Sequence, residues 1–210
     1  MGHLDVPARW QQCEDLGGQR RYPRLRAQAG AHRHRSIDHA DHVGLIRDAV
    51  APGETWLELG SGTGAFTLAL ADLLGRGGTI HSIDQDRDAL RSQAAAVRAR
   101  FGGVRLDQRA ADFRRPLGFN GMDGVLMANS IHFVRDKAPV LALVRSYLAP
   151  GGRFVLVEYD ADRGNHWVPH PISYTTWLAV APAAGFNGAR LLGRVPSRFL
   201  NAIYSSVATI

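Results

Sequence analysis

The fold of this chain is decided by one stretch of its sequence, Trp56-Leu57-Glu58-Leu59-Gly60-Ser61-Gly62-Thr63-Gly64-Ala65-Phe66. It predicts a buried strand that ends at a carboxylate, a turn through three alternating glycines, and a helix that begins at Ala65. Glycines alternate in this way where the backbone turns tightly and a ligand comes close, because a Cβ atom would block the approach. Glu58, two positions before the first glycine, is therefore predicted to face whatever binds at the turn.

An acidic residue also ends the second predicted strand, which runs from Thr79 to Asp84, twenty residues after Gly64. A carboxylate in this place can accept hydrogen bonds from both hydroxyls of a ribose. Gln85 follows it directly. The alternative is that Asp84 only caps the helix that begins near Arg87.

The third predicted strand, from Val104 to Ala110, is followed by Asp112 and Phe113. Here the alternative is that Asp112 only starts a turn. The order of strands and helices continues in the same way to the end of the chain. Further strands are predicted over residues 122–128, 153–159, 190–195 and 200–207, and further helices over 137–148 and 172–184. Five strand–helix units and a closing hairpin predict an α/β fold, a Rossmann-like, doubly wound, mostly parallel sheet of seven strands with a C-terminal antiparallel hairpin strand.

Two motifs together identify a family. The glycine turn with its acidic residues, and the L-x-P-G-G-x-F element from Leu148 to Phe154, resemble the class I S-adenosylmethionine (SAM)-dependent methyltransferases from about residue 40 to the end of the chain. The resemblance implies that Asp112 meets the adenine amino group and that Phe113 packs near the ring. It also implies SAM as the cofactor, bound by Glu58, Gly60, Ser61, Gly62, Gly64, Asp84, Gln85, Asp112, Phe113 and Asn129.

Three other readings of the glycine turn stay open. Gly60, Gly62 and Ala65 also fit the G-x-G-x-x-G/A pattern of a nicotinamide-dependent oxidoreductase, in which a pyrophosphate sits at the helix N-terminus. SAM has no phosphate but carries an ammonium, which suits Glu58 better. The second is a module that binds SAM or S-adenosylhomocysteine (SAH) without transferring a methyl group. The third is a turn of this kind with no ligand.

His132 is the candidate catalytic residue. It follows the fourth predicted strand, beside the crevice where open α/β sheets bind ligands, and histidine is the usual general base near neutral pH. The alternative is a histidine that only shapes the pocket. Residues 158–160 and the polar and aromatic residues of the following loop (Asn165, His166, Trp167 and His170) are predicted to form the acceptor wall.

The acceptor is predicted to be a small molecule with an oxygen or nitrogen nucleophile. Ala128-Asn129-Ser130-Ile131 stands where nucleic-acid N-methyltransferases carry D/N-P-P-Y/F. The single cysteine, Cys13, lies outside the predicted core, which excludes a catalytic thiol. No inserted segment is large enough to grip a macromolecule, so nucleic acid is not favoured.

Composition sets further limits. The 210 residues suit one domain, and 45% are hydrophobic. No stretch approaches about 18 uninterrupted apolar residues, so we expect no membrane span. A single cysteine and no visible secretory signal predict a cytoplasmic protein. Without CxxC or HExxH patterns, we expect no metal site.

The net charge of +6 is unevenly distributed. Residues 1–36 hold seven arginines and three acidic residues, which leaves the rest of the chain near neutral. There are 24 arginines but one lysine, Lys137. Residues 1–35 are predicted to be a disordered basic extension rather than an RNA-binding arm, because they have little apolar content. The methyltransferase domain is predicted over residues 36–210, with Ser36 capping a first helix that runs to Val50. The resemblance implies that this helix closes over the methionine end of SAM.

Overall fold

The computed structural model describes residues 37–197 and 199–210. The predicted disordered extension, residues 1–35, and the predicted cap Ser36 lie outside the described residues. Seven strands are present: β1 (Thr55–Leu59), β2 (Thr79–Asp84), β3 (Arg105–Ala110), β4 (Met122–Ala128), β5 (Leu148–Tyr159), β6 (Asn187–Pro196) and β7 (Ala202–Thr209). The helices are α1 (His39–Ile46), α2 (Ala65–Leu74), α3 (Arg87–Arg100), α4 (Ala138–Tyr147) and α5 (Tyr174–Val180), with 3-10 turns η2 (Arg47–Ala49) and η3 (Ile131–Phe133).

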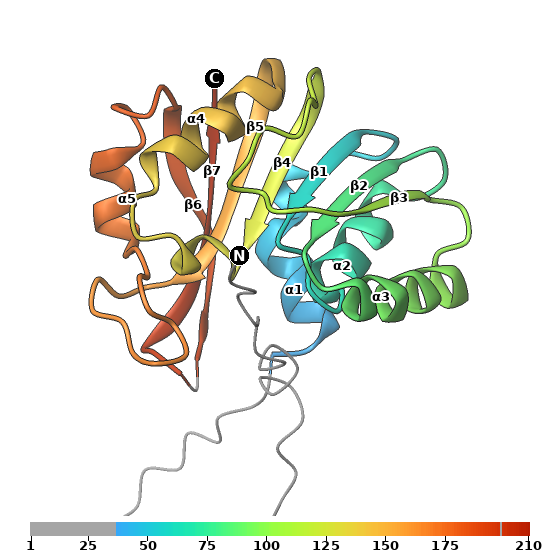
Figure 1. The fold of residues 1–210 in the computed structure, drawn as a ribbon, viewed down its shortest axis with the longest axis horizontal. Coiled ribbons are helices and arrows are strands. Elements are labelled where there is room, and N and C mark those ends of the chain that lie inside the picture. The colour runs from blue at the N-terminus through green and yellow to red at the C-terminus, as the bar shows by residue number, and fades with distance from the viewer. Residues whose placement is uncertain (1–36, 198) are drawn as a thin grey trace, which may run out of the picture. The chain divides into compact units, whose positions relative to one another are not determined.

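All seven strands form one sheet in the order β3-β2-β1-β4-β5-β7-β6 (Figure 1). The first five strands pair in parallel, while β7 pairs antiparallel to both β5 and β6. The direction of growth reverses at β1, so β1 and β4 flank the topological switch point, where ligands bind in folds of this class. The predicted fold class is confirmed.

Helices cover both faces of the sheet (Figure 1). One apolar cluster joins α1, α2 and α3 to side chains such as Trp56 and Ile80. The other joins α4 and α5 to Leu57, Leu59 and Phe154 on the opposite face. Because neighbouring residues of β1 point to opposite faces, the buried strand Trp56 to Leu59 feeds both clusters.

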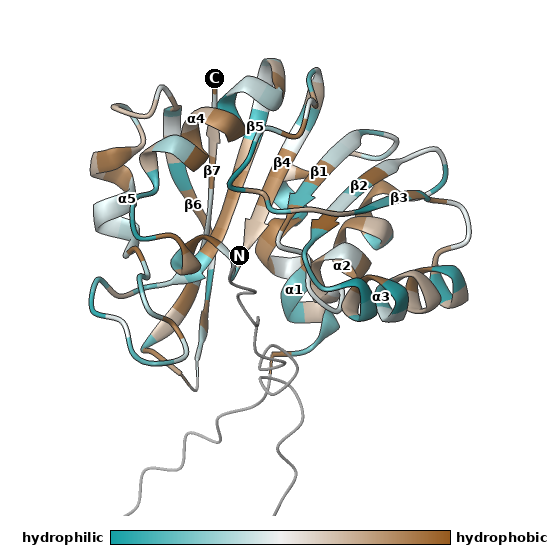
Figure 2. Ribbon diagram, in the orientation of Figure 1, coloured by the Kyte–Doolittle hydropathy of each residue, from teal (hydrophilic) through white to brown (hydrophobic). Residues whose placement is uncertain are grey.

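Burial follows the position of each strand in the sheet. Figure 2 shows β4 and β5 mostly apolar along their length, and both are largely buried. The sequence of β3, Arg-Leu-Asp-Gln-Arg-Ala, is polar and none of its residues is fully buried, as expected at a sheet edge. Burial of the apolar central strands stabilises the sheet, and the polar side chains of the site lie at the carboxyl ends of the strands.

Three predictions about elements were wrong in detail. Five strand–helix units were predicted, but residues 111–121, between β3 and β4, form a loop, so only the β1, β2, β4 and β5 strands of the described part are followed by an α-helix. β5 begins at Leu148 rather than Arg153, because Leu148 pairs with Met122 across an irregularity in the β4–β5 ladder. The first helix ends at Ile46, and the chain to Ala49 is a 3-10 turn.

Candidate functional site

The glycine turn after β1 is tied to the end of β2. The N–H groups of Gly60 and Ser61 donate to the carbonyl of Ile83 at 2.8 and 3.1 Å. The N–H of Gly62 donates to Oδ2 of Asp84 at 2.7 Å. The turn is therefore held by bonds within the protein, and one of them ends at the carboxylate predicted to bind ribose.

The three glycines of the turn serve different purposes. A Cβ at Gly60 would lie 2.5 Å from Cβ of Ser130, and one at Gly64 would lie 2.5 Å from Cγ of Gln93. Packing alone therefore requires glycine at these two positions. At Gly62, where φ is 53°, a Cβ would meet no heavy atom of the described residues within 4 Å. Gly62 is thus the glycine that faces open space, where a ligand can approach.

Asp84 does not cap α3. The cap is Asp86, whose Oδ1 accepts from the N–H groups of Asp88 and Ala89 at 2.8 and 3.0 Å. Oδ1 of Asp84 instead accepts from the N–H of Asp86 at 2.9 Å. Gln85, between the two, is exposed. Each oxygen of Asp84 thus has one partner in the protein and keeps a second lone pair for a ligand hydroxyl.

Glu58 is buried, and its carboxylate is directed at α2. Thr67 donates to Oε2 of Glu58 at 2.5 Å, and Gln93 donates to Thr67 at 2.7 Å. Burial raises the pKa of Glu58 to about 8, helped by the charge of Asp84 and opposed by the Thr67 hydrogen bond. Glu58 was predicted to face the ligand at the turn, but in the structure its carboxyl group is buried and its partner is Thr67 of α2.

A chain of buried polar side chains continues from Gln93 to the glycine turn. Ser82 of β2 donates to Oε1 of Gln93 at 2.9 Å and lies 2.7 Å from the hydroxyl of Ser61. Ser61 is buried, so its side chain supports the turn from inside. The sequence did not predict this series of hydrogen bonds, because its residues come from separate elements and have no characteristic spacing.

The residues predicted to contact adenine lie just after β3. The Nε and Nη2 atoms of Arg114 donate to Asp112 between 2.8 and 3.1 Å. Hydrogen bonds from Arg114 lower the pKa of Asp112. Asp112 also starts a turn, because its carbonyl accepts from the N–H of Arg115. Phe113 is buried, and its Cε1 lies 3.3 Å from the position of a Cβ on Gly60. The ring therefore borders the glycine turn, while the carboxylate is already paired.

Asn129 follows β4, across the switch point from the glycine turn. Its φ is 50°, a left-handed value that is uncommon outside glycine. Its N–H donates to the carbonyl of Val157 at 2.9 Å. Among the described residues, its buried Oδ1 accepts no hydrogen bond. A strained backbone and an unsatisfied buried acceptor together are typical of a ligand-binding position.

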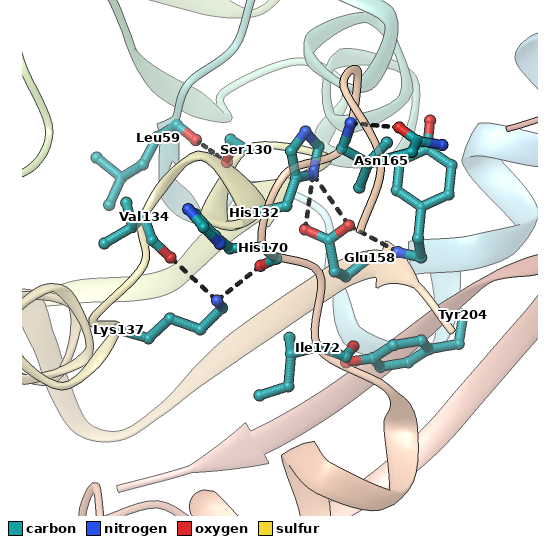
Figure 3. Close-up of polar contacts among 12 residues, drawn as sticks. Leu59, Ser130, His132, Val134, Lys137, Glu158, Asn165, His170, Ile172 and Tyr204 are labelled. Atoms are coloured by element: carbon teal, nitrogen blue, oxygen red, sulfur yellow. Dashed lines mark hydrogen bonds and ion pairs between the residues drawn. The ribbon is translucent and has the colours of Figure 1, made fainter. Parts of the chain in front are cut away.

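His132 and Glu158 form a buried pair at the carboxyl ends of β4 and β5 (Figure 3). Nδ1 of His132 lies 3.0 Å from both carboxylate oxygens of Glu158. The N–H of Tyr159 donates to Oε1 of Glu158 at 2.7 Å. The rings of Phe133 and Tyr159 pack around the imidazole, with centroids 4.1 and 5.7 Å away. The carboxylate thus fixes the orientation of the buried His132 side chain.

Glu158 was predicted to line the acceptor wall, but its side chain is fully buried and in contact with Nδ1 of His132. The loop after it is well anchored. Asn165 Oδ1 accepts from the N–H groups of Trp167 and Val168, both at 2.9 Å. The N–H of His170 donates to the carbonyl of His132 at 3.0 Å. The loop is therefore bonded to the backbone of the candidate base, and Trp167 is 45% exposed.

The first helix begins with a capping box. Asp38 accepts from the N–H of Asp41, and Asp41 accepts from the N–H of Asp38, so these aspartates stabilise the helix start. Nε2 of His39 lies 3.0 Å from Oδ2 of Asp72 on α2. Over the described ranges, no three His, Cys, Asp or Glu side chains gather in a way that could hold a metal ion. No helix of the described part is long and apolar enough to cross a membrane.

Lys137 was noted in the sequence only as the single lysine. The structure places it at the start of α4, where Nζ donates to the carbonyls of Val134 and His170 at 3.0 and 2.7 Å (Figure 3). It thereby joins the segment that carries His132 to the loop after β5. Its uniqueness among 25 basic residues was the only signal in the sequence.

Comparisons with known proteins point to one family. A family model described as a methyltransferase domain matches residues 57–154. Lovastatin diketide synthase from Aspergillus terreus is 29% identical over 166 residues, which cover 66% of this chain and 7% of that protein. The ubiquinone/menaquinone biosynthesis C-methyltransferase UbiE of Teredinibacter turnerae is 30% identical over 118 residues, covering 55% of this chain and 47% of that protein. The chain thus spans less than half the length of these curated relatives.

A solved structure has the same fold. The 1,6-didemethyltoxoflavin-N1-methyltransferase of Burkholderia thailandensis, with 1,6-didemethyltoxoflavin and S-adenosylhomocysteine bound, superposes with a TM-score of 0.66. The two sequences are 19% identical, and the match covers 83% of this chain and 79% of that chain. At this identity, the likeness concerns the fold.

Proposed function

We propose that this chain, whose residues 57–154 match a methyltransferase-domain family model, is a class I SAM-dependent methyltransferase that transfers a methyl group from SAM to a small-molecule acceptor, which gives up a proton to His132. The family-model match supports the methyltransferase family, and with it the SAM cofactor, expected from the sequence. The acceptor and the role of each site residue are our proposal. The observation that carries it is the buried His132–Glu158 pair at the edge of the sheet that also holds Gly62.

The residues at the switch point fit SAM. The open side of Gly62 leaves room for a ligand in van der Waals contact with the backbone. Asp84 keeps lone pairs for the ribose hydroxyls. Oδ1 of Asn129 needs a hydrogen-bond donor, and the ammonium of SAM offers three. These groups would hold the adenosine and methionine ends on either side of the turn.

The same turn fits a dinucleotide poorly. A pyrophosphate binds to free backbone N–H groups at the start of the helix. Here the N–H groups of Gly60, Ser61, Gly62 and Gly64 already donate within the protein. This arrangement argues against the nicotinamide-dependent oxidoreductase.

The pair can act as a general base. When Glu158 is ionised it can only accept hydrogen bonds, so Nδ1 of His132 carries the hydrogen and Nε2 keeps its lone pair. Bound SAM supplies an electrophilic methyl group on a sulfonium. His132 would accept the proton from the acceptor atom, which frees the electron pair that forms the bond to the transferred methyl group, and SAH would be the other product. Glu158 stabilises the imidazolium until the proton passes to water.

We favour a carbon acid as the acceptor. A C–H group beside a carbonyl becomes a nucleophile only after it loses its proton, so it requires a base held beside the methyl donor. A neutral amine requires none. The relative from Teredinibacter turnerae is a C-methyltransferase by name. Hydroxyl and amine acceptors, predicted from the sequence, are the other outcomes of the test.

The cytoplasmic location predicted from the single cysteine is also part of the proposal.

The test measures SAH release with three kinds of small acceptor: a 1,3-dicarbonyl thioester, a phenol and a primary amine. We expect turnover with the thioester, and exchange of its acidic hydrogen in deuterium oxide even without SAM. Glu158→Gln should slow both by about 10²-fold or more, because the neutral amide cannot stabilise the imidazolium. Turnover with the amine alone, at a rate unchanged in Glu158→Gln, would overturn the base role. SAM binding without turnover or exchange would support a binding module instead.

A further inference from the structure

Glu158 presents a problem of charge. Its side chain is fully buried, and a buried carboxylate is costly unless a positive charge lies nearby. The obvious partner is His132, whose Nδ1 lies 3.0 Å from both oxygens. If His132 supplied that charge it would be protonated, and a protonated imidazole cannot take a proton from an acceptor. Hydrogen bonds from the N–H of Tyr159 and from Nδ1 of a neutral His132 stabilise the carboxylate, and a second cation beside Glu158 would stabilise it further.

Lys137 is in the right place to be that cation. It is half-buried, and its side chain reaches from the start of α4 toward the pair (Figure 3). Burial lowers the pKa of Lys137, while the negative charge of Glu158 acts in the opposite direction. An ammonium is a compact charge with three donors, two of which bind the carbonyls of Val134 and His170. In a chain with 24 arginines, this is the one place where a lysine stands.

Two other titratable groups, Tyr204 and Arg194, do not provide a positive charge to Glu158. Tyr204 of β7 donates its hydroxyl to the carbonyl of Ile172 at 3.1 Å. Burial, with the charge of Glu158, raises the pKa of Tyr204, so it stays neutral. Arg194 of β6 is paired with Asp160, with Nη2 2.7 Å from Oδ2. Tyr159 contributes its backbone N–H to Glu158, and the backbone N–H of His170 bonds to the His132 carbonyl.

We propose that Lys137 is a positioning residue that keeps Glu158 ionised while His132 stays neutral and able to accept a proton. Its ammonium compensates the buried carboxylate, so the imidazole does not have to. Through the His170 carbonyl it also holds the loop that bonds to the backbone of His132. This role deepens the proposed function and rests on it, but its electrostatic part is measurable without any methyl acceptor.

The experiment follows the ring signal of His132 by NMR during a pH titration of the full chain, with the signal assigned from its loss in His132→Asn. Lys137→Met removes the charge and the donors. Lys137→Gln removes the charge but keeps two N–H donors, and Lys137→Arg keeps the charge. Arg135→Gln is the matched control, because it removes an exposed positive charge two residues away.

We expect the titration midpoint of the His132 signal to rise by about one pH unit in the Met and Gln variants, because each loses a nearby positive charge. It should stay near the wild-type value in Lys137→Arg and Arg135→Gln. With an acceptor present, the ascending limb of the rate profile should move by the same amount. A midpoint unchanged in Lys137→Gln would overturn the proposal, as would an equal shift in Arg135→Gln. If no acceptor is turned over, the titration still decides the role of Lys137.

Discussion

The N–H of Gly62 donates a 2.7 Å hydrogen bond to Oδ2 of Asp84. The glycine that faces open space and the carboxylate predicted to hold ribose are thereby joined across 22 residues of sequence. The bond ties the turn after β1 to the end of β2. A substitution at either residue therefore also affects the other. Each variant needs a control that separates an effect on SAM binding from an effect on stability.

Asp84→Ala should weaken SAM binding by about 1–3 kcal/mol, because two ribose hydroxyls lose their acceptor. Asp86→Ala is the matched control two residues away. It removes the cap of α3 and should cost about 1 kcal/mol of stability with little effect on affinity. Calorimetry and urea unfolding of both variants give the two quantities. Equal SAM affinity in wild type and Asp84→Ala would remove the ribose assignment.

Gly62→Val should abolish SAM binding, because a branched side chain would occupy the ligand space beside the turn. Gly53→Val is its control, since Gly53 has a φ of 82°, open surroundings among the described residues and a position before β1. Both variants should lose about 1–2 kcal/mol of stability from the left-handed backbone. In calorimetry at a SAM concentration of about tenfold the wild-type Kd, only Gly62→Val should show no binding. Normal binding by Gly62→Val would mean that the cofactor lies elsewhere.

Glu58 should make the protein less stable as the pH rises. Its pKa increases from 4.5 to about 8 in the folded state, so between these values the folded chain holds a proton that the unfolded chain has lost. The free energy of unfolding should therefore fall across this window, by at most about 1.4 kcal/mol per pH unit from this group. Glu58→Gln stays neutral and can still accept from Thr67. Urea unfolding from pH 5 to 9 should show a flatter profile for this variant.

Glu54→Gln is the matched control for that experiment. Burial acts to raise the pKa of Glu54, but hydrogen bonds from Trp56, Ala51 and Arg153 outweigh it and lower the pKa. A lowered pKa contributes stability above 4.5 that is lost as the pH falls. Glu54→Gln should thus be destabilised at neutral pH. The same pH profile in wild type and Glu58→Gln would show that the carboxyl group is not buried neutral.

The sheet could be predicted because its signals are local. An apolar run before Gly60 predicts a strand, and the glycines predict the turn, whatever the rest of the chain does. The loop over residues 111–121 and the early start of β5 could not be predicted in this way. The early start of β5 depends on how this strand pairs with its neighbour, as Leu148 does with Met122, and pairing is a property of the assembled sheet.

The site was predictable as a set of positions but not as a set of contacts. Residues at strand ends, such as Asp84 and His132, must meet at one edge of a parallel sheet. Which groups they contact depends on side chains brought together by packing. Arg114 pairs with Asp112 through a local turn, and Glu158 turns inward to His132. The spacing of residues in the sequence predicts neither the direction of a side chain nor its burial.

His132→Ala should leave SAM affinity nearly intact and lower turnover by about 10²–10⁴, the usual contribution of a positioned base. His132→Asn should be nearly as slow, because an amide keeps a hydrogen bond to Glu158 but takes no proton near neutral pH. His81→Asn is the control, since His81 lies on β2 near Asp107 and takes no part in the site. The ascending limb of the pH–rate profile should vanish in both His132 variants.

A histidine that only shapes the pocket predicts a different pattern. His132→Asn would then recover most of the activity, and the loss in His132→Ala would appear mainly as a raised KM. Steady-state kinetics over a range of pH therefore separate the two roles. Equal kcat in wild type and His132→Asn would exclude proton transfer by this residue. Methyl transfer would then depend only on holding the acceptor in line with the sulfonium.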